Sequence, residues 1–208
     1  LSRNITDDRS WDVSVCLDGF VGRKLLPVNS PLCGFLKQAW GSSHKPLSPH
    51  RREDLARLLH DAGRCDWEMP GHFEELRFHA LGVGRRPEPW LPTPPAGQWD
   101  ELGVVSPFVA SGALQQLSAL TAKPLFLISR PEELDKLPLP VTGMFERTWV
   151  LDERAESADQ EDDVPGWLRG LHAKVYVGKR GWDTHVFLGS ANATDAALTA
   201  GRNVEFMV

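Results

Sequence analysis

Apolar and polar residues follow one another along the first part of the chain in a pattern that predicts two strands and two helices. From Trp11 to Asp18 apolar side chains occupy nearly every second position, which is the period of a half-buried strand. Apolar positions recur at helical spacing in residues 32–40 and 48–62, and Ser48 is a suitable N-cap for the second helix. A further strand-like run covers residues 75–81.

Residues 82–99 separate two parts of the chain that differ in the order of their predicted helices and strands. This stretch contains five prolines together with several glycines, so it cannot sustain a helix or a central strand. We therefore expect a linker at residues 85–98, between a first part (residues 1–84) and a second part (residues 99–208).

Beyond the linker, strand-like and helical segments alternate, which is the pattern of an α/β fold with a parallel sheet. Ser111 is placed to cap one helix, and Ser129 with Glu132 has the spacing of a capping box before another. The expected elements are strand 102–105, helix 112–122, strand 125–128, a short helix after Ser129, and strand 145–151.

The composition is that of an ordinary globular protein, with 41% hydrophobic and 25% charged residues in a chain of 208. No stretch approaches the roughly 20 apolar residues that cross a bilayer, and the first thirty residues are polar, so we expect a soluble protein without a targeting segment. Cys16, Cys33 and Cys65 lie far apart and form no Cys-x-x-Cys pair. This spacing favours three buried thiols in a reducing cytoplasm over a metal site.

The formal net charge of −5 is concentrated in one segment. Residues 152–163 hold seven acidic residues and one arginine, a local net of −6, so the remainder of the chain is close to neutral. We interpret the acidic segment as a solvated loop. The basic clusters at residues 23–24, 50–52 and 85–86 are interpreted as solvated surface.

The last segment of the chain carries the candidate chemistry. It is expected to form strand 171–177, strand 185–188, helix 194–200 and a last strand from Asn203.

Within this segment, His172 and Lys174 are two positions apart on a strand, so their side chains project from the same face. The sequence Gly189-Ser190-Ala191-Asn192 leaves a strand just before a helix, where glycine lets the backbone and short polar side chains approach an anion. We therefore expect the histidine, lysine, serine and asparagine to converge on one phosphate. Taken singly, each also has an ordinary structural explanation, as a core histidine, a strand lysine or a helix cap.

Together and in this order, the residues resemble the His-x-Lys and Gly-Ser-x-Asn motifs of the phospholipase D superfamily. The resemblance covers roughly residues 99–208, and it implies that Glu205, an acidic residue shortly after Asn192, orients the histidine. The longer form of the family motif has an aspartate where this chain has Lys179. Branches that act on DNA ends, similar to tyrosyl-DNA phosphodiesterase, also lack that aspartate.

The start of the chain resembles the second half of the same motif. Residues 1–6 are similar to residues 188–194, so that Ser2 and Asn4 would match Ser190 and Asn192 in a first motif copy. Residues 1–84 would then be the end of a first phospholipase D-like half with a helical insertion, and Asp12 could be the acidic residue of that copy. The alternative is a chance Ser-x-Asn sequence.

The resemblance implies a fold and a mechanism. The fold would be α/β, with a mixed, largely parallel sheet flanked by helices, as the second half of a pseudo-two-fold architecture with two motif copies. In this superfamily one histidine attacks phosphorus to form a phosphohistidine and the other transfers protons, with no metal or cofactor. The missing copy would come from an N-terminal half or from a homodimer partner, and without it we expect weak or no activity. The implied catalytic residues are His172, Lys174 and Glu205, and the implied phosphate-binding residues are Ser190, Asn192, Ser2 and Asn4.

A DNA phosphodiester is the expected substrate, in a restriction, defence or repair nuclease. The alternatives are a phospholipid phosphodiesterase or phosphatidyl transferase, and a non-catalytic module that grips phosphate backbones. No His, Cys or Asp cluster has metal-ligand spacing, and Ser190 lacks the Gly-x-Ser-x-Gly context of a serine hydrolase. Trp167 and Trp182 are candidates for base stacking because they are close in sequence to the motif.

Overall fold

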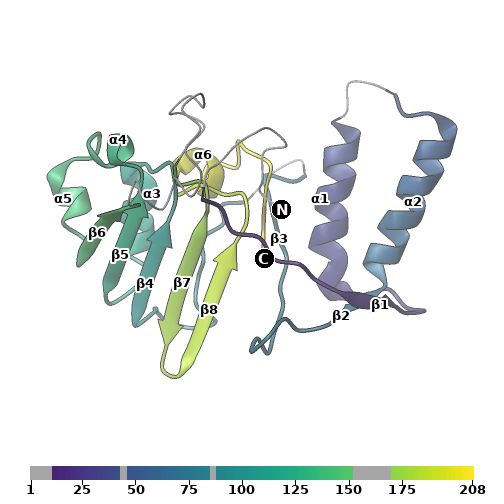
Figure 1. Cartoon of the computed structure of the whole chain (residues 1–208), viewed down its shortest axis with the longest axis horizontal. Helices are drawn as coiled ribbons and strands as arrows, with labels where there is room; N and C mark the ends of the chain where they lie inside the picture. The colour runs from purple at the N-terminus through teal and green to yellow at the C-terminus, as the bar shows by residue number, and fades with distance from the viewer. Residues whose placement is uncertain (1–10, 43–45, 85–87, 152–169) are drawn as a thin grey trace, which may run out of the picture.

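The computed structural model describes residues 11–42, 46–84, 88–151 and 170–208. It is a mixed α/β structure, 29% helical and 26% strand. A five-stranded sheet forms one side of the molecule and a pair of long helices stands beside it (Figure 1).

The central sheet has the strand order β6-β5-β4-β7-β8. The pairs β4–β5 and β5–β6 are parallel, whereas β4–β7 and β7–β8 are antiparallel. The expected mixed sheet is therefore present, but the expectation that it is largely parallel is wrong. The reason is that β7 and β8 form a hairpin with a short turn at Gly181 and Trp182, and a hairpin joins antiparallel strands. The five strands are β4 (Glu101–Val105), β5 (Pro124–Ser129), β6 (Arg147–Val150), β7 (Val175–Arg180) and β8 (Asp183–Leu188).

The main hydrophobic core lies on one face of this sheet. Helix α3 (Ser111–Ser118) and the short helix α6 (Asp195–Leu198) contribute apolar side chains to it. These side chains share a cluster with residues from β4, β5 and β7. Its fully buried members include Trp99, Leu102, Val104, Leu114, Leu117, Leu127, Tyr176, Leu198 and Met207.

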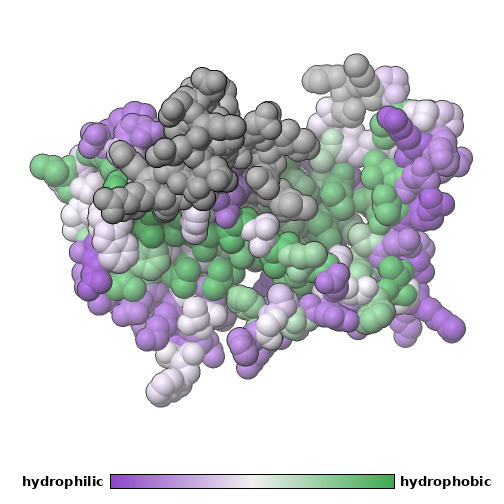
Figure 2. Space-filling model, in the orientation of Figure 1, coloured by the Kyte–Doolittle hydropathy of each residue, from purple (hydrophilic) through white to green (hydrophobic). Residues whose placement is uncertain are grey.

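The other face of the sheet is less covered. A smaller cluster there consists of Val105, Leu171 and Ala173 with partly buried neighbours. The ring of Phe126 occupies the space that a side chain at Gly103 would need, and it stacks on Trp149, which is 46% exposed. Apolar side chains gather on the viewed face of the molecule (Figure 2).

The two long helices confirm the helical predictions for the first part of the chain. They are α1 (Ser30–Gly41) and α2 (Pro49–Gly63), and the Ser48 side chain accepts a hydrogen bond from the Arg51 backbone N–H as a helix cap. A short 3-10 helix, η1 (Pro27–Asn29), precedes α1. At the base of the pair, β1 (Gly19–Val21) runs antiparallel to β2 (Cys65–Trp67).

A further two-stranded sheet connects the two parts of the chain. Strand β3 (His79–Leu81) pairs antiparallel with β9 (Glu205–Met207), so residues before and after the proline-rich stretch share hydrogen bonds. The part of that stretch that the structure describes, from residue 88 onward, holds no helix or strand before β4. The division of the chain at residues 85–98 stays a prediction.

Several expected strands are shorter than the sequence pattern indicates. The run from 11 to 18 contributes only an isolated bridge between Trp11 and Leu171, although Val13, Val15 and Leu17 are half-buried as the alternation predicts. The strand expected at 171–177 begins at Val175. The length of a strand depends on the neighbouring strand with which it pairs, and the local sequence pattern does not show which strand that is.

The two predicted serine caps in the second part are wrong. Helix α3 has Ala110 as its N-cap, and the short helix α4 (Pro131–Leu134) has Arg130; neither residue makes a side-chain cap bond. Ser111 is instead the first helical residue, and Ser129 is the last residue of β5. The remaining helix, α5 (Leu139–Thr142), is a single turn that the pattern did not predict.

The cysteine prediction holds only in part. All three thiols are free, but only Cys65 is buried, while Cys33 is half-buried and Cys16 exposed. The acidic segment at residues 152–163 lies outside the described residues. Within the described ranges, no helix has both the length and the apolar character needed to cross a bilayer.

Candidate functional site

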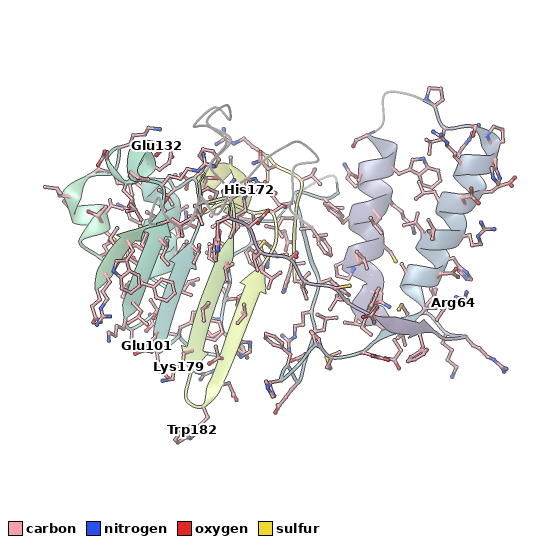
Figure 3. The ribbon with its side chains drawn as sticks, viewed as in Figure 1. Arg64, Glu101, Glu132, His172, Lys179 and Trp182 are labelled. Carbon is pink, nitrogen blue, oxygen red and sulfur yellow. The ribbon has the colours of Figure 1, made fainter. Side chains whose placement is uncertain are left out.

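Three segments, two of which carry motif residues, meet at one end of the central sheet, where β4 and β8 end and β7 begins. His172 and Lys174 immediately precede β7, Ser190 follows β8 closely, and Ser106 follows β4. Because β7 is antiparallel to both neighbours, its beginning lies beside the ends of β4 and β8, where Val175 is paired on both sides. Figure 3 shows His172 near this edge, and Lys179 and Trp182 near the opposite one.

The His172 side chain is held by Asp12. Its Nδ1 lies 3.0 Å from the Asp12 Oδ2, and the two side chains are 19% and 14% exposed. The backbone fixes this contact, since the His172 N–H donates to the carbonyl of Trp11 over 2.8 Å and Trp11 N–H donates to Gly170. A carboxylate at Nδ1 favours the tautomer with a proton on that nitrogen, which leaves the Nε2 lone pair for chemistry.

Lys174 is a buried lysine whose side chain contacts the backbone of His172. The residue is only 3% exposed, and its Nζ donates to the carbonyl oxygen of His172 over 2.5 Å. A buried ammonium costs free energy unless polar groups surround it, so its position next to His172 is a specific feature of this edge.

Ser190 connects the end of β8 to β9. Its hydroxyl donates to the carboxylate of Glu205 and accepts from the Phe206 N–H over 3.0 Å. The Ser190 N–H donates to the Phe206 carbonyl, and Gly189 is needed here because a Cβ would collide with that carbonyl oxygen. The hydroxyl is thereby held in one orientation.

The expected role of Glu205 needs correction. Its carboxylate was expected to orient His172, but the structure places it on Ser190, and Asp12 makes the contact with the histidine. The physical reason is that Leu171 pairs with Trp11, which brings the residue after Trp11 to the imidazole. Asp12 had been expected to serve the first motif copy.

Asn192 lies in the loop after Ser190 with part of its amide unsatisfied. Its Oδ1 is buried and has no hydrogen-bond partner within the described residues. An unpaired buried acceptor costs about 1–3 kcal/mol, and such groups occur where a ligand completes the bonding. The Asn192 backbone carbonyl accepts from Thr194 and starts the turn into α6.

Ser106 and Tyr176, which we had not predicted as site residues, fix this loop. Ser106 is fully buried, and its Oγ accepts from the Ala193 N–H over 2.9 Å. The Tyr176 hydroxyl donates to the Ala191 carbonyl over 2.9 Å, and burial, followed by the charge of Glu205, raises the pKa of this phenol. The signal for Ser106 was its place at the end of a strand before a helix.

Arg130 and Phe108 are two further residues at this edge that the prediction missed. Arg130 follows β5 directly, and its Nε donates to the Leu171 carbonyl over 2.9 Å. Its guanidinium carbon lies 5.1 Å from the ring centroid of Phe108, which is 41% exposed.

Other expected residues are not brought to the site. Trp182 is fully exposed at the hairpin turn beyond β7. Lys179, which was not expected at the site and stands where the longer family motif has an aspartate, pairs with Glu101 at the far end of β7. A six-residue strand spans about 20 Å, so Trp182 is too distant to stack on a base next to His172. Ser2, Asn4 and Trp167 lie outside the described residues.

The edge thus combines an imidazole held by a carboxylate, a buried ammonium, a hydroxyl and a buried amide. A hollow of about 610 Å³ lies elsewhere, among residues of α1 and α2 and the segment before them. In the described ranges, no group of three or more His, Cys, Asp or Glu residues is arranged to hold a metal ion. Comparison with known proteins found no matching family model and no matching curated protein.

Proposed function

We propose that this chain is part of a phosphodiesterase of the phospholipase D type that acts through His172. The observation that carries the proposal is the 3.0 Å contact between His172 Nδ1 and Asp12, with Lys174 adjacent. A carboxylate on Nδ1 prepares Nε2 for nucleophilic attack or proton transfer. The sheet edge with its motif loop supports the phospholipase D-like fold as part of the same proposal.

In the proposed reaction, His172 Nε2 either attacks phosphorus or transfers the proton. As nucleophile it would form an N–P bond while the bond from phosphorus to the leaving oxygen breaks. A second histidine would give that oxygen its proton and then accept a proton from the water that releases the phosphoryl group. The Lys174 side chain and the side-chain N–H groups of Asn192 would donate hydrogen bonds to the other phosphate oxygens and stabilise their negative charge, a role that the Asn192 Oδ1, an acceptor, could not fill.

The second histidine is not part of a second motif in this sequence. The chain contains one His-x-Lys pair, so the partner would come from another segment of a longer protein or from a second copy. The presence of one His-x-Lys pair also favours one alternative function, a module that binds phosphate without catalysing its hydrolysis.

For the substrate we infer a nucleic-acid phosphodiester. The support is the resemblance of the motif, which has Lys179 in place of an aspartate, to the branches that act on DNA ends. Lipid phosphodiesters are the alternative that an experiment must separate from it.

The first test is cleavage of labelled single- and double-stranded DNA in excess EDTA by the chain in a form that includes the second histidine, as a longer protein or with a second copy, and by the His172→Ala variant of that form. We expect cleavage that persists in EDTA and is lost in the variant. The matched control is His50→Ala, because His50 is a solvent-exposed histidine on α2, and this variant should cleave as the unaltered chain does.

Three other outcomes would contradict the proposal. If the His172→Ala variant still cleaves DNA, then His172 has no part in the mechanism. Turnover of phospholipid vesicles without DNA cleavage would assign a lipid substrate. DNA binding without cleavage of either substrate would favour the phosphate-binding module.

A further inference from the structure

Phe108 is a partly exposed aromatic residue at the catalytic edge of the sheet. It lies in the loop between β4 and α3, and 41% of the residue is exposed. The guanidinium of Arg130 lies over its ring at 5.1 Å, so one side of the ring has a cationic partner. This contact is within the range in which a cation and a ring attract each other.

Both members of the pair are tied to the candidate site. The Phe108 carbonyl oxygen accepts a hydrogen bond from the Ser106 hydroxyl over 2.7 Å. The Ser106 Oγ in turn accepts a hydrogen bond from the backbone N–H of Ala193, in the Ser-Asn loop. Arg130 donates to the carbonyl of Leu171, the neighbour of His172. The backbone at Phe108 and the guanidinium that lies over its ring are therefore each bonded to a segment that leads to the motif residues.

Three other exposed aromatic residues in the described part of the chain do not share this placement. Trp11 is also near His172 and is 46% exposed, but it neighbours Asp12 in an extended segment. Neighbouring side chains in extended chain point to opposite sides, and Asp12 faces the imidazole. Trp182 is at the other end of β7, and Trp149 is stacked on Phe126.

We propose that Phe108, backed by Arg130, is a stacking site for a nucleobase that flanks the phosphate bound at His172. This inference rests on the proposed function, because a nucleic acid presents a phosphate and a planar base at a fixed separation. Aromatic rings and guanidinium planes are the surfaces on which single-stranded bases stack. A phospholipid headgroup offers no such planar ring.

The test measures the affinity for single-stranded DNA by fluorescence anisotropy in EDTA, with His172→Ala present in every protein so that the oligonucleotide is bound without being cut. One labelled oligonucleotide carries normal bases, and a second of equal length and charge carries abasic sites. The variants are Phe108→Leu, which keeps most of the apolar volume but removes the ring, and Phe108→Trp, which restores a ring. Trp182→Ala is the control because it removes an exposed aromatic residue far from the site.

We expect Phe108→Leu to weaken binding of the normal oligonucleotide by roughly five- to a hundredfold and to leave binding of the abasic one nearly unchanged. Phe108→Trp should restore the affinity, and Trp182→Ala should not alter it. Circular dichroism and sedimentation of each variant report whether the fold and the association state are intact.

Two results would overturn the stacking site. One is an equal affinity of the unaltered chain and Phe108→Leu for the normal oligonucleotide, and the other is an equal loss on both oligonucleotides. Base-dependent binding at Phe108 without any cleavage would retain the stacking site and refute the phosphodiesterase. Cleavage that depends on His172 but not on Phe108, together with base-independent binding, would support the phosphodiesterase and refute the stacking site.

Discussion

Asp12 and His172 are 160 positions apart in the sequence, yet their side chains meet at 3.0 Å. The Asp12 carboxylate has a second bond, from the backbone N–H of Val13 to Oδ1 over 2.8 Å, which orients it. A carboxylate in this position selects one imidazole tautomer and stabilises the imidazolium that forms when Nε2 takes a proton.

Asp12→Asn is therefore expected to lower turnover much more than binding. The amide keeps the shape of the side chain but removes the charge that stabilises the imidazolium, and we expect kcat to fall by roughly a hundredfold or more. Steady-state kinetics on a DNA substrate measures kcat and KM separately. Asp18→Asn, an exposed carboxylate in the same segment, should leave both unchanged. A rise in KM with an unaltered kcat would contradict the role.

The sequence alone indicated that His172, Lys174, Ser190 and Asn192 would lie near one another, but it assigned the contact with His172 to Glu205 and not to Asp12. His172, Lys174, Ser190 and Asn192 are brought to one edge because each lies beside a strand end that the pattern could indicate. Glu205 had a plausible spacing, whereas Asp12 reaches the imidazole through a tertiary pairing of Trp11 with Leu171. No local pattern contains that pairing.

At the scale of the elements, the close approach of β8 and β9 determines where the Ser-Asn loop begins. Gly189 forms a bridge with Met207, and there is no space for a side chain because the Phe206 carbonyl oxygen occupies it. The loop that carries Ser190 therefore depends on a glycine at the preceding position.

Gly189→Ala is expected to separate β8 from β9 and displace Ser190. Backbone must move to admit the methyl group, so we expect the free energy of unfolding to fall by about 2–4 kcal/mol and activity to fall with it. Urea denaturation gives the change. The control is Gly34→Ala in α1, where a methyl group meets no atom within 4 Å and helix propensity should add about 0.5–1 kcal/mol. If the two variants are equally stable, then β8 and β9 can move apart without a cost in the free energy of unfolding, and the expected role of Gly189 is wrong.

The helices were easier to predict than the strands for a reason visible in these elements. The cap of α2 is a local contact between Ser48 and Arg51, so the sequence contains both partners. Strand β7 begins only at Val175 because the residues before it hydrogen-bond to the segment at Trp11 and not to β4 or β8. Strand β9 pairs with β3, which is more than a hundred residues earlier in the chain. Propensity could not supply these pairings.

Across the whole molecule, β3 is one of the segments through which the first part of the chain joins the core. His79 of β3 is half-buried, with its ring 5.4 Å from that of Trp90 and 6.1 Å from that of Phe187. Burial, and then the positive charge of Arg77, lowers the pKa of this imidazole below its usual value. The folded protein therefore disfavours protonated His79.

Acidification should accordingly weaken the fold through His79. The unfolded chain binds this proton more readily, so the contribution of neutral His79 is complete above the ordinary histidine pKa of about 6.5 and declines as the pH falls below it. Urea unfolding at pH 7.5 and 5.5 should show a larger loss for the unaltered chain than for His79→Gln. His72→Gln, which changes an exposed histidine, should behave as the unaltered chain. An identical pH dependence in all three proteins would exclude this role.

The distance along the chain between Asp12 and His172 also has a consequence for protein synthesis. A ribosome adds residues at roughly 5–20 per second, so on the order of ten seconds or more pass between these two residues. Throughout that interval the growing chain carries the carboxylate without the imidazole that it holds, and after residue 81 it also carries β3 without its partner β9. A chain that is interrupted before residue 172 therefore carries Asp12 without the histidine that it contacts.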